Sequence, residues 1–278
     1  MMKRFLFFIM TCCALSIYAY DPCFVVVIPS YNNAAFYKEN LDSVMNQKYE
    51  QFEVLYVADC CTDNTDTYVL DYVKNHPRKD KITVICNPVR RGALANIYMA
   101  VHRIPDDKIV VMVDGDDWLD NDMVLERIAC EYRNPDVWLT YGQMRNLPLC
   151  REIEDYVYRN KSFRETAWVT SHPKTFYAGL FKRIKKEDLI DYRTGNFYSM
   201  TSDLAFMFPM LEMCSRKNIR FIPDSLYVYN MGNPLSDGRI DPTFQHQLEH
   251  EIRTKKKYAQ LRLASWLSSS EKQELSAN

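Results

Sequence analysis

The chain has little glycine and almost no net charge. It has 7 glycines among 278 residues, against 19 tyrosines and 14 phenylalanines. Loops built from several glycines are therefore few, and aromatic rings line much of the interior and surface. Lys and Arg number 35 and Asp and Glu 36, which gives a formal net charge of -1. Such a balance creates no overall attraction to nucleic acid, so a nucleic-acid partner is not expected.

Long apolar runs are absent after the first twenty residues. Residues 5–19 carry no charge and follow Lys3 and Arg4. Because a bilayer span needs about twenty apolar residues, this stretch favours a secretory signal over a membrane-spanning helix. Cleavage after Ala19 is plausible, but Ile17 stands where a small residue is usual, so an uncleaved N-terminal membrane anchor is the alternative. Either interpretation predicts an exported or secretory-pathway protein, with possible membrane association through the N-terminus.

Paired cysteines with the C-x-x-C spacing of a zinc site are absent as well. The chain has nine cysteines, and removal of Cys12 and Cys13 with a signal would leave an odd number. At least one free thiol or an intermolecular bridge would follow. An exported location permits disulfides, but the sequence does not assign them. The remaining seven are Cys23, Cys60, Cys61, Cys86, Cys130, Cys150 and Cys214.

Apolar runs alternate with helical patterns from residue 24 to residue 113, which is typical of βαβ units around a parallel sheet. We expect strands at 24–28, 52–58, 81–86 and 108–113, and helices at 34–47, 65–75 and 93–103. The rhythm changes after Gly142. There we expect a Met-rich helix at 203–214, short strands at 221–223 and 226–229, and a helix at 244–267 with a solvated face at 255–257.

The last expected strand ends in an acidic turn. Val110 to Val113 is followed at once by Asp114, Gly115, Asp116 and Asp117. In open α/β sheets, ligands bind just beyond the carboxyl ends of such strands. Three carboxylates within four residues repel one another unless a cation or hydrogen-bond donors compensate. The turn therefore predicts a metal-assisted site, although an ordinary turn or helix cap accounts for one or two acids alone.

An EF-hand calcium loop is excluded at this turn. If Asp114 is taken as its first position, Leu119 stands where the sharp turn needs glycine. Leu125 then stands where the bidentate glutamate belongs.

Two polar loops follow the first two expected strands. They are residues 29–33 and 59–65, and they lie at the same sheet edge as the acidic turn, so the three loops should converge. Asp63 or Thr65 can equally serve to cap the next helix. Asp59 is less easily a cap, so it is the better candidate for a hydrogen bond to a nucleobase or ribose.

These motifs together resemble a family 2 glycosyltransferase. The matching stretches are residues 25–33 (VVVIPSYNN), 41–47 (LDSVMNQ), 59–65 (DCCTDNT) and 114–117 (DGDD), in the family's order and spacing. They cover residues 24–142. The resemblance implies a GT-A type nucleotide-diphospho-sugar transferase fold: an α/β fold with a mostly parallel central sheet flanked by helices, an acceptor-side extension and a C-terminal helix.

What the resemblance implies chemically is transfer of a sugar, with inversion, from a nucleoside-diphosphate sugar, with UDP-sugars favoured. The acceptor would be a hydroxyl of a glycan, lipid or protein glycan, and Mn²⁺ or Mg²⁺ would assist. Asp116 and Asp117 would ligate the metal, while Asp114 would hold the ribose or donor sugar or share the metal. Donor or nucleotide contacts would come from Pro29, Tyr31, Asn32, Asp59, Arg91, Gly92, Asn96 and Asp114.

Two departures from the family pattern leave the choice of donor open. The family usually has two acids before the second loop, where this chain has Ala58 and Asp59. Its Gly-Ser pair is replaced by Cys60 and Cys61.

The second half should supply a carboxylate that takes the proton of the acceptor hydroxyl. By resemblance this catalytic base is Asp203, at the start of the helix expected at 203–214. A helix-capping role for Asp203 is the alternative, and Asp188 is the reserve candidate for the base. Between the acidic turn and Asp203, three residues are candidates for acceptor or pyrophosphate contacts: Trp168, His172 and Lys174. Trp168 or Trp118 can stack on a sugar.

Other functions fit the sequence less well. Sugar nucleotidyltransferases usually carry a Gly-rich basic loop after the first strand, and residues 29–33 are not one. A non-catalytic nucleotide-sugar or glycan-binding module is disfavoured because all three acids of the turn are present. A processive synthase is disfavoured because a Gln-x-x-Arg-Trp sequence is absent. The expected organisation is 1–20 signal or anchor, 21–143 nucleotide-sugar-binding half, 144–232 acceptor-binding and catalytic half, and 233–278 helical tail.

Overall fold

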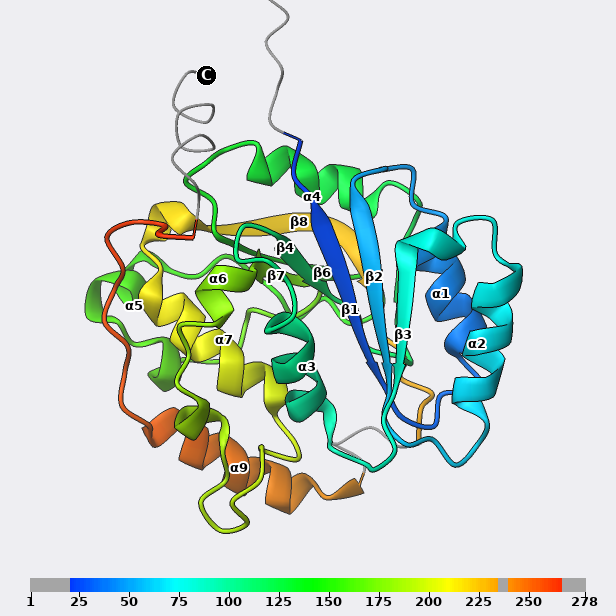
Figure 1. Ribbon diagram of the computed structural model, residues 1–278. Coiled ribbons are helices and arrows are strands. Elements are labelled where there is room, and N and C mark those ends of the chain that lie inside the picture. Colours follow the sequence, from blue (N-terminus) through cyan, green and yellow to red (C-terminus); the bar gives the residue numbers. More distant parts are fainter. Residues whose placement is uncertain (1–20, 235–239, 267–278) are drawn as a thin grey trace, which may run out of the picture.

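The computed structural model describes residues 21–234 and 240–266 (Figure 1). The first half has the expected βαβ order. Strands β1 (Phe24–Ser30), β2 (Phe52–Ala58), β3 (Ile82–Cys86) and β4 (Ile109–Met112) pair in parallel, and helices α1 (Tyr37–Met45), α2 (Thr65–Asn75) and α3 (Ala93–Val101) connect them. Helices α1 and α2 pack against each other, and α3 packs against β1. The predicted parallel sheet is confirmed.

The sheet continues into the second half. Strand β7 (Lys174–Tyr177) runs antiparallel to β4, and β6 (Leu139–Met144) runs antiparallel to β7. Strand β8 (Ile219–Val228) is parallel to β6, and β5 (Trp118–Leu119) pairs with β8. The eight strands take the order β3-β2-β1-β4-β7-β6-β8-β5. The mixed sheet flanked by helices confirms the predicted α/β fold class.

Further helices lie over this extended sheet or, in the case of the last one, against another helix (Figure 1). They are α4 (Val124–Tyr132), α5 (Asp155–Asn160), α6 (Ala178–Phe181), α7 (Ser202–Met213) and α9 (Pro242–Thr254). Short 3₁₀ turns occur at Lys79–Lys81, Phe163–Glu165, Lys186–Leu189 and Arg216–Asn218.

The central strands are buried on both faces. All seven residues of β1 and all four of β4 are buried, as expected of continuous apolar runs covered by helices on each side. Strand β7 extends this centre in a fixed register, in which Met112 pairs with Lys174 and Ile109 with Tyr177. Lys174 therefore lies at the carboxyl end of β4, next to the acidic turn.

The helix expected at 244–267 is shorter than predicted. It ends at Thr254, and Lys255 is already extended, with ψ of 156°. Beyond it, the amide of Tyr258 donates to the Glu212 carboxylate, and the amide of Leu261 donates to the carbonyl of Met213. These bonds to α7 replace helical ones, so the prediction for the second half of this helix was wrong.

The two short strands expected at 221–223 and 226–229 form one strand, β8. Its pairing with β6 shifts register between Tyr141 and Met144, and this irregularity accommodates the break that Pro223 introduces into the sequence pattern. Strand β7 was not predicted, because its first two residues, Lys174 and Thr175, are polar although both are buried.

The predicted signal or anchor at residues 1–20 lies outside the described residues. Within residues 21–234 and 240–266, no helix combines the length and apolarity needed to cross a membrane. The seven cysteines from Cys23 to Cys214 are free thiols.

Candidate active site

The acidic turn is held tightly against the first loop. A Cβ atom on Gly115 would lie 2.6 Å from the Cβ of Ser30 and from Nδ2 of Asn33, so only glycine fits here. The side-chain amide of Asn40 donates to the carbonyls of Asp114 (2.9 Å) and Asp117 (2.7 Å). The backbone of the turn is thereby fixed before any ligand arrives.

The three carboxylates of the turn have different surroundings. Asp117 is buried, and its Oδ1 accepts from the amide of Asn230 at 2.7 Å. Burial, together with the charges of Asp114 and Asp116, raises the pKa of Asp117 to about 8. The carboxylate of Asp116 accepts from Nδ2 of Asn233 at 2.6 Å. Asp114 is more open than Asp117, with 41% of its side chain exposed.

A chain of contacts leads from this turn to the predicted base. Nε2 of His172 lies 3.6 Å from Oδ2 of Asp114 and 2.9 Å from Nζ of Lys174. The same Nζ lies 3.8 Å from Oδ2 of Asp203. Burial and the charge of Lys174 lower the pKa of His172 well below its usual value, so the imidazole is neutral. The structure thus brings together residues predicted separately for donor, acceptor and base.

Asp203 lies in the first turn of α7, with 29% of its side chain exposed. Thr201 is the N-cap residue, and no side chain caps this helix, so the capping alternative for Asp203 is not observed. The reserve candidate Asp188 lies in a 3₁₀ turn and accepts from the hydroxyl of Tyr258. Asp203 is therefore the better placed of the two carboxylates.

The first two polar loops are joined by side-chain bonds, which confirms their predicted convergence. Asn32, at φ +52°, accepts from the amide of Thr62 at 2.8 Å and donates to its hydroxyl at 3.0 Å. Asp63 accepts from the amides of Ala34 (2.9 Å) and Thr65 (3.0 Å). Asp63 thus stabilises the start of α2, as the capping alternative allowed, and also ties it to the first loop.

Tyr31 and Pro29 lie beside this junction. The guanidinium carbon of Arg90 lies 3.7 Å from the ring centroid of Tyr31, a close cation–π contact. The carbonyl of Pro29 accepts from the amide of Gly115. Tyr31, stacked with Arg90, provides a flat aromatic and cationic surface at the edge where a nucleoside is expected.

Asp59 organises the loop before α3. It accepts from Nδ2 of Asn87 (2.9 Å) and from the amides of Arg91 (2.9 Å) and Gly92 (2.8 Å). Burial alone would raise the pKa of Asp59, but these hydrogen bonds outweigh it and lower the pKa. Asn96 is also buried and accepts from Asn87 at 2.7 Å. Any contact from Asp59 to a base would share oxygens that already accept these bonds.

A set of metal-compatible donors lies at the centre of the site. Ligand atoms of Asp114, Asp117 and His172 lie within 4.8 Å of one another. Oδ2 of Asp117 is buried and has no hydrogen-bond partner among the described residues. Carboxylate oxygens with a neutral imidazole suit Mn²⁺, so the residues fit a divalent cation. This set differs from the predicted pair, because Asp116 is held by Asn233 and is not part of it.

Sequence reasoning missed the residues that support the turn from β8. Tyr227 stacks on His172, with ring centroids 4.5 Å apart and planes 21° apart, and its hydroxyl accepts from the amide of Asp114 at 3.0 Å. Asn230 and Asn233 follow in the next loop and bind Asp117 and Asp116. The sequence does show polar residues after the strand predicted at 226–229. That pattern does not indicate where the strand lies in the sheet, so it could not place Asn230 and Asn233 beside the acidic turn.

The sequence profile of Glycosyl transferase family 2 matches residues 25–201 of the chain. The chain belongs to this family. A relative of this glycosyltransferase, the putative colanic acid biosynthesis glycosyl transferase WcaA of Escherichia coli (strain K12), is 24% identical over 158 residues. That alignment covers 57% of this chain and 51% of the relative, so the chain spans about half the length of WcaA.

Solved structures share the fold of this family 2 glycosyltransferase. Staphylococcus aureus TarS 1–349 in complex with UDP-GlcNAc superposes with a TM-score of 0.58 at 22% identity, covering 83% of this chain and 65% of TarS. The mannosyltransferase PcManGT from Pyrobaculum calidifontis, in complex with GDP-Man and Mn²⁺, gives 0.57 at 22% identity, covering 86% and 66%. At this identity the likeness establishes the GT-A nucleotide-sugar transferase fold.

Proposed function

We propose that this glycosyltransferase moves a sugar, with inversion and with help from a divalent cation, from a nucleoside-diphosphate sugar to a hydroxyl of a glycan. A UDP-sugar is the favoured donor. The relay of contacts from Asp114 through His172 and Lys174 to Asp203 carries the proposal, because it joins the donor-side acids to a carboxylate across the sheet. The ligands named for the TarS and PcManGT structures support the donor class and the cation.

Mn²⁺ or Mg²⁺ would be held by Asp114, Asp117 and His172. When bound, the ion supplies Lewis-acid stabilisation of the charge on the departing nucleoside diphosphate. The buried Asp117 suits this role because a cation would offset both the burial and the repulsion by Asp114 and Asp116 that raise its pKa. Asn233 orients Asp116 at the edge of the site, where its carboxylate is available to the donor sugar or to a water on the ion.

Asp203 takes the proton of the acceptor hydroxyl in this mechanism. Lys174 is almost fully buried, and its ammonium lies between His172 and Asp203, so it orients the carboxylate at the face opposite the leaving group. Tyr31 with Arg90 holds the nucleoside, and the loop fixed by Asp59 forms the wall beside it. With the donor held in this way and the hydroxyl deprotonated by Asp203, the acceptor oxygen attacks the anomeric carbon directly, which inverts its configuration.

We further propose that the mature protein is exported or anchored by its N-terminus in the secretory pathway. The basic and apolar composition of residues 1–19 supports this proposal. Sequencing the N-terminus of protein purified from the native host distinguishes cleavage after Ala19 from an uncleaved anchor.

The decisive experiment is a panel of nucleotide sugars assayed for release of nucleoside diphosphate with Mn²⁺, with Mg²⁺ and with EDTA. One donor should be consumed, and EDTA should abolish its use. The matched variants Asp117→Ala and Asp116→Ala separate the metal assignments, since Asp117→Ala should lose metal-dependent turnover and Asp116→Ala should retain more of it. Nucleotide binding without sugar release would instead support a binding module. Formation of sugar-1-phosphate and nucleoside triphosphate when pyrophosphate is supplied would support a nucleotidyltransferase.

A further inference from the structure

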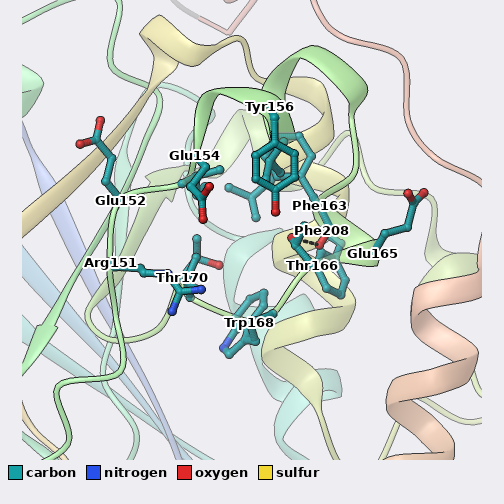
Figure 2. Close-up of a pocket in the computed structure, with 15 residues that line it drawn as sticks. Arg151, Glu152, Glu154, Tyr156, Phe163, Glu165, Thr166, Trp168, Thr170 and Phe208 are labelled. Carbon is teal, nitrogen blue, oxygen red and sulfur yellow. Dashed lines mark hydrogen bonds between the residues drawn. The ribbon is translucent and has the colours of Figure 1, made fainter.

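A cavity lies beside α7, and none of the residues that line it belongs to the acidic turn or contacts it. It has a volume of about 330 Å³ and lies between α5, the segments 151–154 and 163–170, and α7. Figure 2 shows Trp168 and Tyr156 on opposite sides of it, with Phe208 of α7 to one side. Pockets of a few hundred Å³ are the size that encloses small ligands or single units of larger ones.

The walls of the cavity are aromatic and well supported. Trp168 meets Phe208 edge to face, with centroids 5.4 Å apart and planes 81° apart. The guanidinium groups of Arg164 and Arg253 lie 5.6 and 5.1 Å from the Phe208 centroid. Phe208 is thus clamped between cations and the indole, so the aromatic surface of the cavity is preformed.

Polar groups without partners face the same space. Thr170 is 2% exposed, and its hydroxyl has no hydrogen-bond partner among the described residues. Arg151 and Glu154 lie at the mouth on the same side (Figure 2), and within the part of the chain that the structure describes neither side chain takes part in an ion pair. A buried hydroxyl without a partner is costly and indicates a ligand or water.

The remaining charges around the mouth are already neutralised. Glu152 lies 3.7 Å from Arg216, and Glu165 lies 2.5 Å from Lys257. The cavity therefore offers aromatic faces, one cation, one carboxylate and a hydroxyl, without a surplus of positive charge. It lacks the cationic cluster that would bind phosphate, and it is too polar at its mouth for a lipid chain alone.

We infer that this cavity binds an uncharged sugar ring of the acceptor, one or more units away from the ring that receives the transferred sugar; the inference rests on the proposed function. A sugar ring has an apolar C–H face that packs on Trp168 and a rim of hydroxyls that Glu154, Arg151 and Thr170 bond. The cavity would select oligosaccharide acceptors over single sugars.

The position of the cavity suits such a subsite. Phe208 follows Asp203 by five residues on α7, a rise of about 7.5 Å along the helix. Thr170 precedes Lys174 by four residues on the segment that enters β7. The same two elements therefore carry the proposed base and the cavity.

Binding tests the sugar assignment without turnover. Purified protein with saturating UDP and Mn²⁺ is titrated with neutral trisaccharides, with a ribitol-phosphate oligomer and with a short-chain alkyl detergent, using isothermal calorimetry. At least one neutral trisaccharide should bind, and Trp168→Ala and Tyr156→Ala should each raise its Kd about tenfold. Tyr192→Ala, an equally bulky aromatic on the exposed surface, is the matched control and should leave the Kd unchanged. Binding of the phosphate oligomer or the detergent alone, or of no neutral glycan, overturns the inference.

Kinetics separate this inference from the proposed function. With the trisaccharide that binds, the acceptor KM should rise about tenfold in Trp168→Ala and kcat should change little, while the KM for the matching monosaccharide stays the same. An equal loss for both acceptors would contradict the cavity's role and leave the glycosyltransferase proposal intact. If neither acceptor nor donor is consumed by the wild type, the proposed function fails instead, and the calorimetric result still decides whether the cavity binds sugar.

Discussion

The contacts that stabilise the first half of the molecule differ in kind from those that stabilise the second half. In the first half, short side chains tie one loop to the next, as when Asp63 accepts from Ala34 and Asp59 accepts from Arg91 and Gly92. In the second half, long charged side chains are buried, with Arg164 bonded to Glu212 at 2.6 Å. The loops of the first half follow strands whose apolar runs are visible in the sequence, whereas the buried charged pair of the second half is visible only after the chain is folded.

The largest effect in this comparison is expected for Asp203→Asn, since it removes the carboxylate of the second half that we propose as the catalytic base. Turnover should fall by about 10³-fold, the usual range for loss of a general base. UDP affinity should not change, because the proposed nucleotide contacts all lie in the first half. Steady-state kinetics and calorimetry with UDP check both parts, and unchanged turnover would refute the assignment of the base.

Removing the buried ion pair should destabilise the second half strongly. Arg164→Met leaves Glu212 charged and without its partner, and should lower the free energy of unfolding by about 3 kcal/mol. Urea denaturation measures this loss, and the double variant Arg164→Met with Glu212→Leu should recover most of it. Lys217→Ala, which breaks the exposed pair with Asp136, is the control and should cost at most about 0.5 kcal/mol. A similar small cost at Arg164 would show that the buried pair does not stabilise the fold.

Asp59→Asn should destabilise the first half by about 2 kcal/mol at neutral pH, because a charged acceptor of three hydrogen bonds becomes neutral. The pKa of Asp59 is lowered in the folded state, so its stabilisation is present above its ordinary pKa near 3.9 and is lost as the pH falls through the folded value. The difference between variant and wild type should therefore shrink below about pH 4.

Denaturant melts at several pH values measure this convergence. Glu53→Gln, at an exposed position of β2, is the control and should show little effect at any pH. A difference that stays constant down to pH 3 would contradict the role given to the Asp59 carboxylate.

Tyr227→Phe is the mildest change and tests the link between the halves. It keeps the stack on His172 but removes the hydroxyl that accepts from the amide of Asp114. The apparent Kd for Mn²⁺ should rise about fivefold, equivalent to about 1 kcal/mol. Titration of Mn²⁺ by electron paramagnetic resonance checks it, with Tyr68→Phe on the exposed side of α2 as control. An unchanged Kd would show that β8 does not orient the metal site.

Much of the first half could be predicted because each of its signals is local. A buried strand reads as an apolar run, a crossover helix as a periodic stretch, and the carboxyl ends of parallel strands must meet at one edge. The acidic turn after Val113 and the loop at Asp59 were found in this way. The sequence did not show that carboxylate oxygens of Asp59, Asp116 and Asp117 already accept hydrogen bonds from other groups of the protein.

The second half was harder to predict because strand β7 begins with polar residues that are nevertheless buried. Lys174 and Thr175 read as surface residues, yet both lie in β7 between β4 and β6. Asn233 similarly gave no sign that it would hold Asp116. The helix expected to reach residue 267 failed for a related reason, since the amides after Lys255 find better acceptors on α7 than in their own segment.

The register of β7 against β4 has a consequence for how such an enzyme can diversify. Lys174 stands opposite Met112, and a slip of two residues would carry it about 7 Å along the sheet, away from Asp203. Residues 172–177 therefore tolerate no insertion, whereas residues 145–163 lie outside the ladder and before the buried Arg164, and can change in length and composition. New acceptor preferences can evolve in that segment while the chemistry beside it stays in place.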